Sequence, residues 1–302
     1  MKKILNITIL TLLIILLFNS AIFSQTGKKI TVGCKDFTEQ YVLGDIIAQL
    51  LQYNGFQVTD KFGMAAAIAR SALVNKQIDI LPDYTGTAWG TYFRSDEKIN
   101  DPVELYERVK QEDLEKNDMV WMGRTSFNNT YALAIKNDRV DSIGTTISDL
   151  AEYVNQNSGN VTFAVNPTFY QREADGFFPM AREYGMNVIK NNVKPMDTGL
   201  TYNAVSRDQV DVAMVFGTDA KLRSFDLFVL EDDKQFFPIY NISIVVRKEI
   251  LDKYPEIESI LEPITKIIDT ETMINLNYEV DGNGKPSKMV AVDFLKDQGL
   301  ID

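Results

Sequence analysis

The sequence predicts an α/β protein of two lobes, each a β-sheet flanked by helices, with a ligand cleft between the lobes. Residues 30–81 alternate short apolar runs with amphipathic stretches in the order β-α-β-α-β. Residues 161–213 repeat this order. The chain has 302 residues and 45% hydrophobic content, which is enough for more than one average domain.

The first unit begins with a short apolar run, ITVGC at residues 30–34, typical of a buried strand. A helical pattern of apolar residues opens at Thr38 and ends at Gly55. The remaining elements are predicted as a strand at 56–58, a helix at 65–74 and a strand at 78–81.

The second unit repeats side chains as well as element order. The run QIDI at 77–80 is matched by QVDV at 209–212, and Tyr84 by Phe216 at the same offset; chance similarity is the alternative. Because loops at the carboxyl ends of parallel strands form the binding edge of such a sheet, we expect both aromatic residues to face the cleft. The predicted strands of this unit are 161–165, 187–189 and 210–213, with helices ending near Gly185 and Val205.

Two further strand-like segments, residues 126–136 and 237–246, are predicted to carry the chain from one lobe to the other. Two crossings imply a hinge. We expect lobe 1 to comprise residues 28–128 and 240–302, lobe 2 to comprise residues 129–239, and the crossings to lie near 128–133 and 236–242.

The first 24 residues have the order of a cleavable signal peptide. Lys2 and Lys3 precede an apolar run at 4–18, which small and polar residues follow. The alternative is an uncleaved membrane anchor, but the run is shorter than the roughly 20 residues that span a bilayer. A signal peptide predicts a periplasmic or otherwise extracytoplasmic protein. No cysteine directly follows the apolar run, so we expect no lipid anchor.

The composition excludes several classes of function. The chain has no histidine, which removes the commonest general base and transition-metal ligand, and it has no Gly-rich phosphate loop. Its net charge of −11 argues against nucleic acid as a partner. The one cysteine, Cys34, excludes an internal disulfide and is expected to be a small buried residue. We expect no enzyme, no metal and no cofactor.

Aromatic residues follow the third strand of each unit and also begin both crossing segments. These are Tyr84, Phe216, Tyr131 and Tyr240. Four such rings could form a cage for a cation that donates no hydrogen bonds, such as a trimethylammonium group. They could equally be ordinary core residues, because the chain has 17 Phe and 13 Tyr. Periodicity alone does not separate these readings.

Four sequence blocks occur in order: VGCKDFTEQ at 32–40, DYTGT at 83–87, NTYAL at 129–133, and DVA running to FGTD at 211–219. Together they resemble the glycine betaine/carnitine/choline-binding proteins of ABC importers, from about residue 29 to the C-terminus. The resemblance implies a two-lobed periplasmic-binding-protein fold of type II.

The resemblance also implies the ligand-binding residues. The aromatic cage would be Tyr84, Tyr131, Phe216 and Tyr240, and the polar contacts, including a carboxylate clamp, would be Lys35, Thr87, Arg172, Asn129 and Gln40. Relatives usually carry Tyr at the position of Phe216 and Ser at that of Cys34. Choline-preferring members tend to carry an acid at the position of Thr87, so Thr87 favours a zwitterion such as glycine betaine or carnitine.

The expected function is capture of a quaternary-ammonium osmoprotectant by a monomer that passes it to a membrane permease driven by an ATPase. One alternative is a ligand sensor for a membrane receptor, which a neighbouring permease and ATPase gene pair would argue against. The other is a transferase-type enzyme on the same fold, which would consume its ligand.

Overall fold

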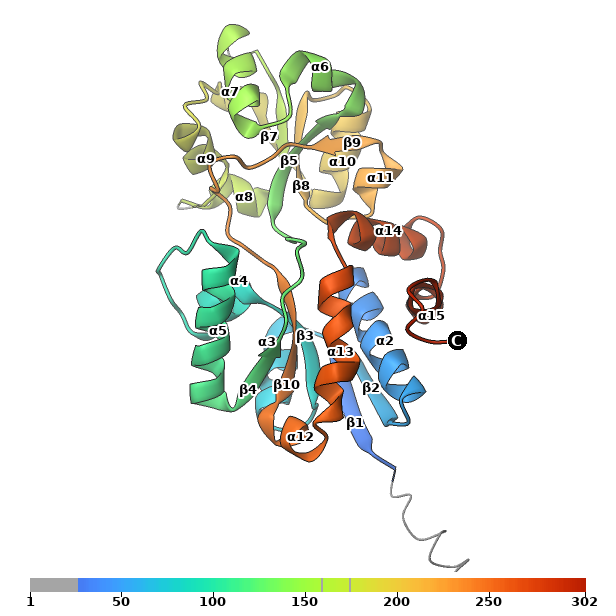
Figure 1. The fold of residues 1–302 in the computed structure, drawn as a ribbon. Coiled ribbons are helices and arrows are strands. Elements are labelled where there is room, and N and C mark those ends of the chain that lie inside the picture. Colours follow the sequence, from blue (N-terminus) through green and yellow to red (C-terminus); the bar gives the residue numbers. More distant parts are fainter. Residues whose placement is uncertain (1–26, 159, 174) are drawn as a thin grey trace, which may run out of the picture.

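The computed structural model describes residues 27–158, 160–173 and 175–302. Two five-stranded sheets form two lobes, one above the other in Figure 1. The expected signal peptide, residues 1–24, lies outside the described residues. Within the described ranges no helix is both long and apolar enough to cross a membrane.

The sheet of the first lobe has the strand order β2-β1-β3-β10-β4. Its strands are β1 (Lys29–Lys35), β2 (Gln57–Met64), β3 (Ile80–Tyr84), β4 (Met119–Met122) and β10 (Ile242–Arg247). Its helices are α2 (Thr38–Tyr53), α3 (Ala66–Val74), α4 (Thr85–Thr87), a π-helical turn (Ala88–Tyr92), α5 (Pro102–Asn117), α12 (Lys248–Lys253), α13 (Glu256–Ile267), α14 (Thr270–Asp281) and α15 (Ser287–Asp297).

The sheet of the second lobe has the corresponding order β7-β6-β8-β5-β9. Its strands are β5 (Tyr131–Lys136), β6 (Phe163–Val165), β7 (Val193–Pro195), β8 (Val212–Phe216) and β9 (Leu227–Val229). Its helices are α6 (Val140–Ile143), α7 (Ile147–Gln156), α8 (Pro167–Gln171), α9 (Phe177–Glu183), α10 (Thr198–Ser206) and α11 (Lys221–Ser224), with 3₁₀ turns at Asn137–Arg139 and Lys190–Asn192. Two sheets flanked by helices confirm the predicted fold class.

Both sheets are mixed, whereas the sequence pattern suggested parallel sheets. In each lobe the strand that follows a crossing segment runs antiparallel to its neighbours: β10 pairs antiparallel with β3 and β4, and β5 with β8 and β9. The reason is topological. A chain that arrives from the other lobe enters at the end of the sheet where β3 or β8 leaves, so it must run in the opposite direction.

One predicted strand is wrong. Residues 187–189 do not form a strand. The strand that pairs parallel with β6 at this edge of the sheet is β7, which begins six residues later, with Phe163 of β6 opposite Val193. Val188 instead packs against the core of the second lobe. Short runs of apolar residues occur both in strands and in loops that pack against a core. The apolar pattern at 187–189 therefore did not distinguish the two.

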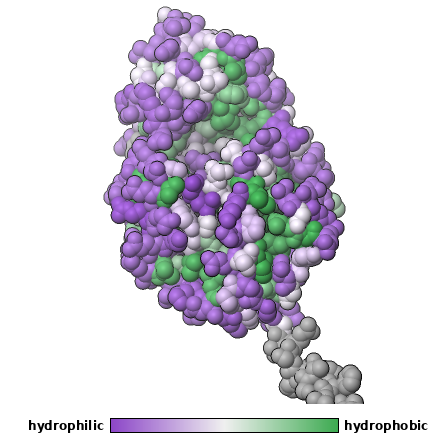
Figure 2. Space-filling model, in the orientation of Figure 1, coloured by the Kyte–Doolittle hydropathy of each residue, from purple (hydrophilic) through white to green (hydrophobic). Residues whose placement is uncertain are grey.

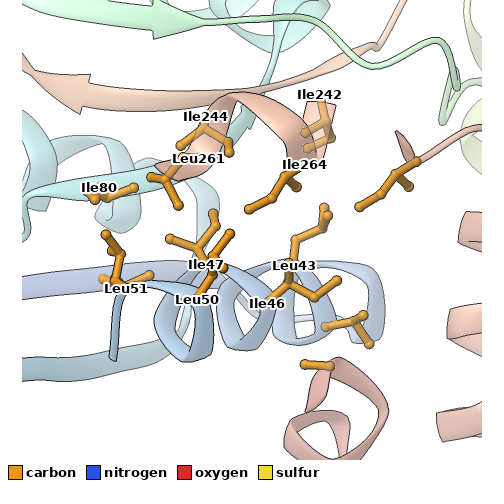
Figure 3. Close-up of a cluster of buried hydrophobic side chains, with 14 of the residues drawn as sticks. Leu43, Ile46, Ile47, Leu50, Leu51, Ile80, Ile242, Ile244, Leu261 and Ile264 are labelled. Carbon is orange, nitrogen blue, oxygen red and sulfur yellow. The ribbon is translucent and has the colours of Figure 1, made fainter. Parts of the chain in front are cut away.

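The core of the first lobe fixes α2 against the sheet. Figure 3 shows Leu43, Ile47 and Leu51 of α2 directed toward side chains of β3, β10 and α13, among them Ile244 and Leu261. Each is at least 99% buried, and burying such a side chain stabilises the fold by about 1.5–3 kcal/mol. The start of α2 is thereby held at the end of the sheet that faces the second lobe. The visible surface in Figure 2 is mostly hydrophilic, in keeping with a core that lies inside each lobe.

The two segments that connect the lobes run side by side and are hydrogen-bonded to each other (Figure 1). The Asn129 N–H donates to the Tyr240 carbonyl (3.2 Å), and the Tyr240 N–H donates to Asn128 Oδ1 (2.7 Å). Asn241 Nδ2 donates to the Phe127 carbonyl at 2.6 Å. The paired segments lie where the hinge is expected, and the hinge itself and the residues at which each lobe begins and ends stay predictions.

A glycine allows the end of β3 to approach the second crossing segment. A Cβ added at Gly86 would lie 2.3 Å from the Ile239 carbonyl oxygen and 2.9 Å from the ring of Tyr240. Because the nearest atom belongs to the backbone, it has no side-chain freedom with which to move away. Gly86 therefore allows α4 to lie against the second crossing segment.

We predict that Gly86→Ala destabilises the protein by about 1–3 kcal/mol, the usual cost of inserting a methyl group into a packed interior. Gly90→Ala is the matched control, because a Cβ at Gly90 meets nothing within 4 Å. Urea unfolding of both variants measures the difference. Equal stability of the two would contradict the role assigned to Gly86.

Candidate ligand-binding site

A cavity of about 480 Å³ lies between the lobes, a volume suited to a small ligand. Six parts of the chain line it: the end of β1 with the start of α2, the start of α3, the end of β3 with α4, the end of β8 with α11, the crossing segments, and α14. The strands β3 and β8 end at Tyr84 and Phe216, so the repeat seen in the sequence places one aromatic residue from each lobe at the cavity.

Three of the four expected cage rings line the cavity: Tyr84, Phe216 and Tyr240. The fourth, Tyr131, does not. Its ring lies behind Phe216, with centroids 5.3 Å apart, and stacks on Phe169 at 5.0 Å. Tyr131 therefore supports Phe216 in this arrangement, because β5 and β8 pair Tyr131 with Phe216 in register.

Tyr84 is 95% buried and already has two partners. The ammonium group of Lys35 lies 4.8 Å from the centre of its ring, and its hydroxyl donates to Glu39 at 2.5 Å. Burial, together with the nearby Glu39, raises the pKa of Tyr84 well above its ordinary value, so the phenol stays protonated. The sequence analysis also missed Phe37, which lines the cavity, is 40% exposed and stacks on Tyr84 with ring centroids 6.2 Å apart. The ring surfaces open to a ligand are therefore those of Phe37, Phe216 and Tyr240.

The two basic residues of the expected clamp are each paired with an acid. Lys35 forms a buried ion pair with Asp83, the residue before Tyr84. Arg172 forms a two-point ion pair with Asp175 and lies over the ring of Tyr131 at 5.7 Å, without lining the cavity. The Asp175 hydrogen bond raises the pKa of Arg172.

The three neutral polar candidates have different positions. Thr87 of α4 lines the cavity. Asn129 also lines it, and its Nδ2 donates to Glu39 at 3.1 Å. Gln40 is fully buried and does not line the cavity; its Oε1 accepts from the Lys35 N–H at 3.1 Å, which fixes the backbone beside the site.

The sequence analysis missed Glu39, a fully hydrogen-bonded acid in the cavity wall. It accepts from Tyr84 Oη and Thr218 Oγ1 at 2.5 Å each, in addition to Asn129. Burial raises the pKa of Glu39, while these donors oppose the rise. The sequence shows only an acid in the first turn of a helix, a common solvated position, so its one distinguishing signal was its place between the candidates Lys35 and Gln40.

Helix α14 was also missed as part of the site. Asn277 lines the cavity, and its Nδ2 donates to the Thr218 carbonyl of the second lobe at 2.8 Å. Ile274, one turn earlier, packs against the core of the second lobe. The C-terminal segment thus contacts both lobes, because α14 packs against α2 of the first lobe and lies directly beneath α11 of the second in the view of Figure 1.

In the described part of the chain, no group of three or more Cys, Asp or Glu side chains is arranged to hold a metal ion. Burial raises the pKa of the Cys34 thiol to about 12, so that Cys34 is a neutral core residue and not a nucleophile.

Residues 28–297 match the family model described as the substrate-binding domain of the ABC-type glycine betaine transport system, OpuAC. The chain belongs to this family. OpuAC-family members are substrate-binding proteins of ABC transporters and not enzymes, which confirms the resemblance noted in the sequence. Family membership implies a small-molecule ligand and a membrane permease as partners.

Several known proteins resemble this OpuAC-family chain over most of its length. It is 40% identical to the glycine-betaine-binding protein of Pseudomonas aeruginosa, covering 91% of this chain and 90% of that protein. It is 37% identical to the ergothioneine transport permease/binding protein EgtU of Helicobacter pylori, covering 90% of this chain but 48% of that longer protein.

The solved structures agree with the fold. Apo YehZ from Escherichia coli superposes with a TM-score of 0.83 at 30% identity, covering 90% of this chain and 99% of that one. Lactococcal OpuAC in its closed, liganded conformation has the same type II periplasmic-binding-protein fold, with a TM-score of 0.54, 18% identity, and coverage of 90% of this chain and 96% of that one.

We predict that Glu39 makes the ligand-free OpuAC-family protein less stable as the pH rises. Because the folded state has the higher pKa, it binds more protons than the unfolded state between the ordinary Glu pKa and the raised value. The free energy of unfolding therefore falls as the pH rises through that window. Glu39→Gln removes this term, so its stability relative to wild type should increase with pH in urea unfolding. A difference independent of pH would contradict the assignment.

Proposed function

We propose that the protein captures a quaternary-ammonium compound of the glycine betaine, carnitine or choline type and delivers it to an ABC permease driven by its ATPase. The observation that supports this proposal most directly is that aromatic rings from both lobes line one cavity, whose wall also contains a buried acid. Relatives named for glycine betaine and carnitine transport support the ligand class. We further propose export by cleavage of residues 1–24, a monomeric state and a role in osmoprotectant uptake.

The rings explain how such a ligand would be held. A trimethylammonium group donates no hydrogen bonds, and the electron-rich face of each ring attracts it by about 0.5–2 kcal/mol. Phe216 belongs to the second lobe, while Tyr240 belongs to a crossing segment. A ligand in contact with both, and with Tyr84, would favour the arrangement in which the lobes are close, with the hinge near 128–133 and 236–242.

A ligand carboxylate would be held by Lys35, Thr87 and Arg172 in this proposal. Such a clamp requires Lys35 to share its ammonium group with Asp83, and Arg172 to turn from Asp175 toward the cavity. Charge-assisted hydrogen bonds could offset the loss of these pairs. The proposed clamp is therefore a rearranged state of residues already near the site.

A thermal-shift screen tests the proposed function. The panel is glycine betaine, carnitine, choline, ergothioneine and a set of amino acids with primary ammonium groups. A ligand that binds only the folded state stabilises it by about 2.7 kcal/mol at one hundred times its Kd. We expect a higher melting temperature with one or more quaternary amines. Stabilisation by amino acids alone would contradict the ligand class, and chemical conversion of a bound ligand would favour the enzyme alternative.

We predict that Phe216→Ala and Tyr240→Ala each weaken binding of the responding ligand by about 0.5–2 kcal/mol or more, because each removes a ring face. Phe216→Tyr should retain binding. Tyr53→Ala is the control: Tyr53 is 52% exposed at the far end of α2. Isothermal titration calorimetry measures the affinity of all four variants. Wild-type affinity in both Phe216→Ala and Tyr240→Ala would refute the cage.

A further inference from the structure

The charges around the cavity are not evenly compensated. Lys35 is paired with Asp83, and Lys221 lies 3.6 Å from Asp219. Glu39 is 97% buried, yet among the described residues no Lys or Arg lies within ion-pair distance of it. The wall of the cavity therefore contains one buried acid whose charge no side chain balances.

Neutral donors hold this acid in place. Tyr84 and Thr218 bond one oxygen each at 2.5 Å, Asn129 adds a third bond at 3.1 Å, and Asn277 Nδ2 lies 3.5 Å from Oε2. Glu39 also stands in the first turn of α2, where the helix dipole favours a negative charge. These interactions oppose the cost of burial without cancelling it, because the pKa of Glu39 is still raised; a bound cation would lower that pKa and favour the ionised form.

The hydrogen bonds that Glu39 accepts also determine which kind of cation it can bind well. Its two oxygens are already occupied by donors, so they offer a ligand electrostatic attraction but few free lone pairs. A primary ammonium group needs acceptors for three N–H bonds and would leave some unsatisfied. A quaternary ammonium group needs none. An additional ligand carboxylate would be repelled by the uncompensated acid.

The geometry points to Glu39 as the counter-ion of the bound ligand and as the residue that makes the site select a quaternary-ammonium compound of net positive charge over a zwitterion. This inference rests on the proposed function and narrows its ligand class to choline-like cations. It opposes the preference suggested by Thr87, because the two basic residues expected to bind a carboxylate are each paired with an acid of their own.

The test is calorimetric titration of wild type and Glu39→Gln with choline, glycine betaine and 3,3-dimethyl-1-butanol, an uncharged analogue of choline. Wild type should bind choline more tightly than glycine betaine, and both more tightly than the alcohol. Glu39→Gln keeps the shape and removes the charge. It should weaken choline binding about tenfold or more, weaken glycine betaine less, and reduce the advantage of choline over the alcohol.

Two control variants separate charge from structure. Asp45→Asn changes another buried acid of α2 whose pKa burial also raises, but Asp45 bonds to Ser287 away from the cavity, so both affinities should stay at wild-type values. Thr218→Val removes the hydrogen bond from the second lobe to Glu39 while leaving the charge. It should change both affinities by a similar factor and leave their ratio unchanged.

The outcomes are distinct. The inference is overturned if Glu39→Gln weakens choline and glycine betaine binding by the same factor, or if wild type binds glycine betaine more tightly than choline. Either result leaves the proposed function standing. Binding of no quaternary amine by wild type overturns the proposed function, and the inference falls with it. A fall in the choline to glycine betaine preference that is confined to Glu39→Gln supports both.

Discussion

The direction of two strands is the constraint on which the site depends. β3 and β8 each run toward the other lobe, and each ends in an aromatic residue at the cavity. Their antiparallel neighbours β10 and β5 are the strands that follow the crossing segments, so both crossing segments lead directly into strands paired beside the two aromatic residues. Tyr84 and Phe216 lie in different sheets, so the spacing of their rings depends on how the two lobes sit relative to each other.

Charge pairing determines what the cavity can offer a ligand. Buried charges are stable only when paired or strongly hydrogen-bonded. Lys35 meets this condition through Asp83, while Glu39 meets it through neutral donors from both lobes and from a crossing segment. The first arrangement neutralises its own charge, whereas the second leaves an acid in an aromatic-lined space that no cationic side chain pairs and whose pKa burial raises. A positive ligand would complete the second arrangement and would gain little from the first.

The fold could be predicted from periodicity because strands and helices bury different patterns of residues. Strand β1 and helix α2 were found this way, whereas residues 187–189 were not a strand, since a half-buried loop residue such as Val188 gives the same local signal. At the site, the repeat located Tyr84 and Phe216 because equal offsets from equivalent strands lead to equivalent edges. Tyr131 pairs with Phe216 without lining the cavity in this structure, and a sequence does not show which of two paired rings faces a cavity, so its place in the cage stays a prediction.

The sequence by itself determined the two β-α-β-α-β units, the aromatic residues at their strand ends and the absence of histidine chemistry, because these depend on local pattern and composition. Only the tertiary structure decided which charges neutralise one another and which side chain stays uncompensated. Glu39 meets Thr218 across 179 positions of sequence and Asn277 across 238. No local pattern encodes such distances, because they arise only when the two lobes and α14 close around the same space.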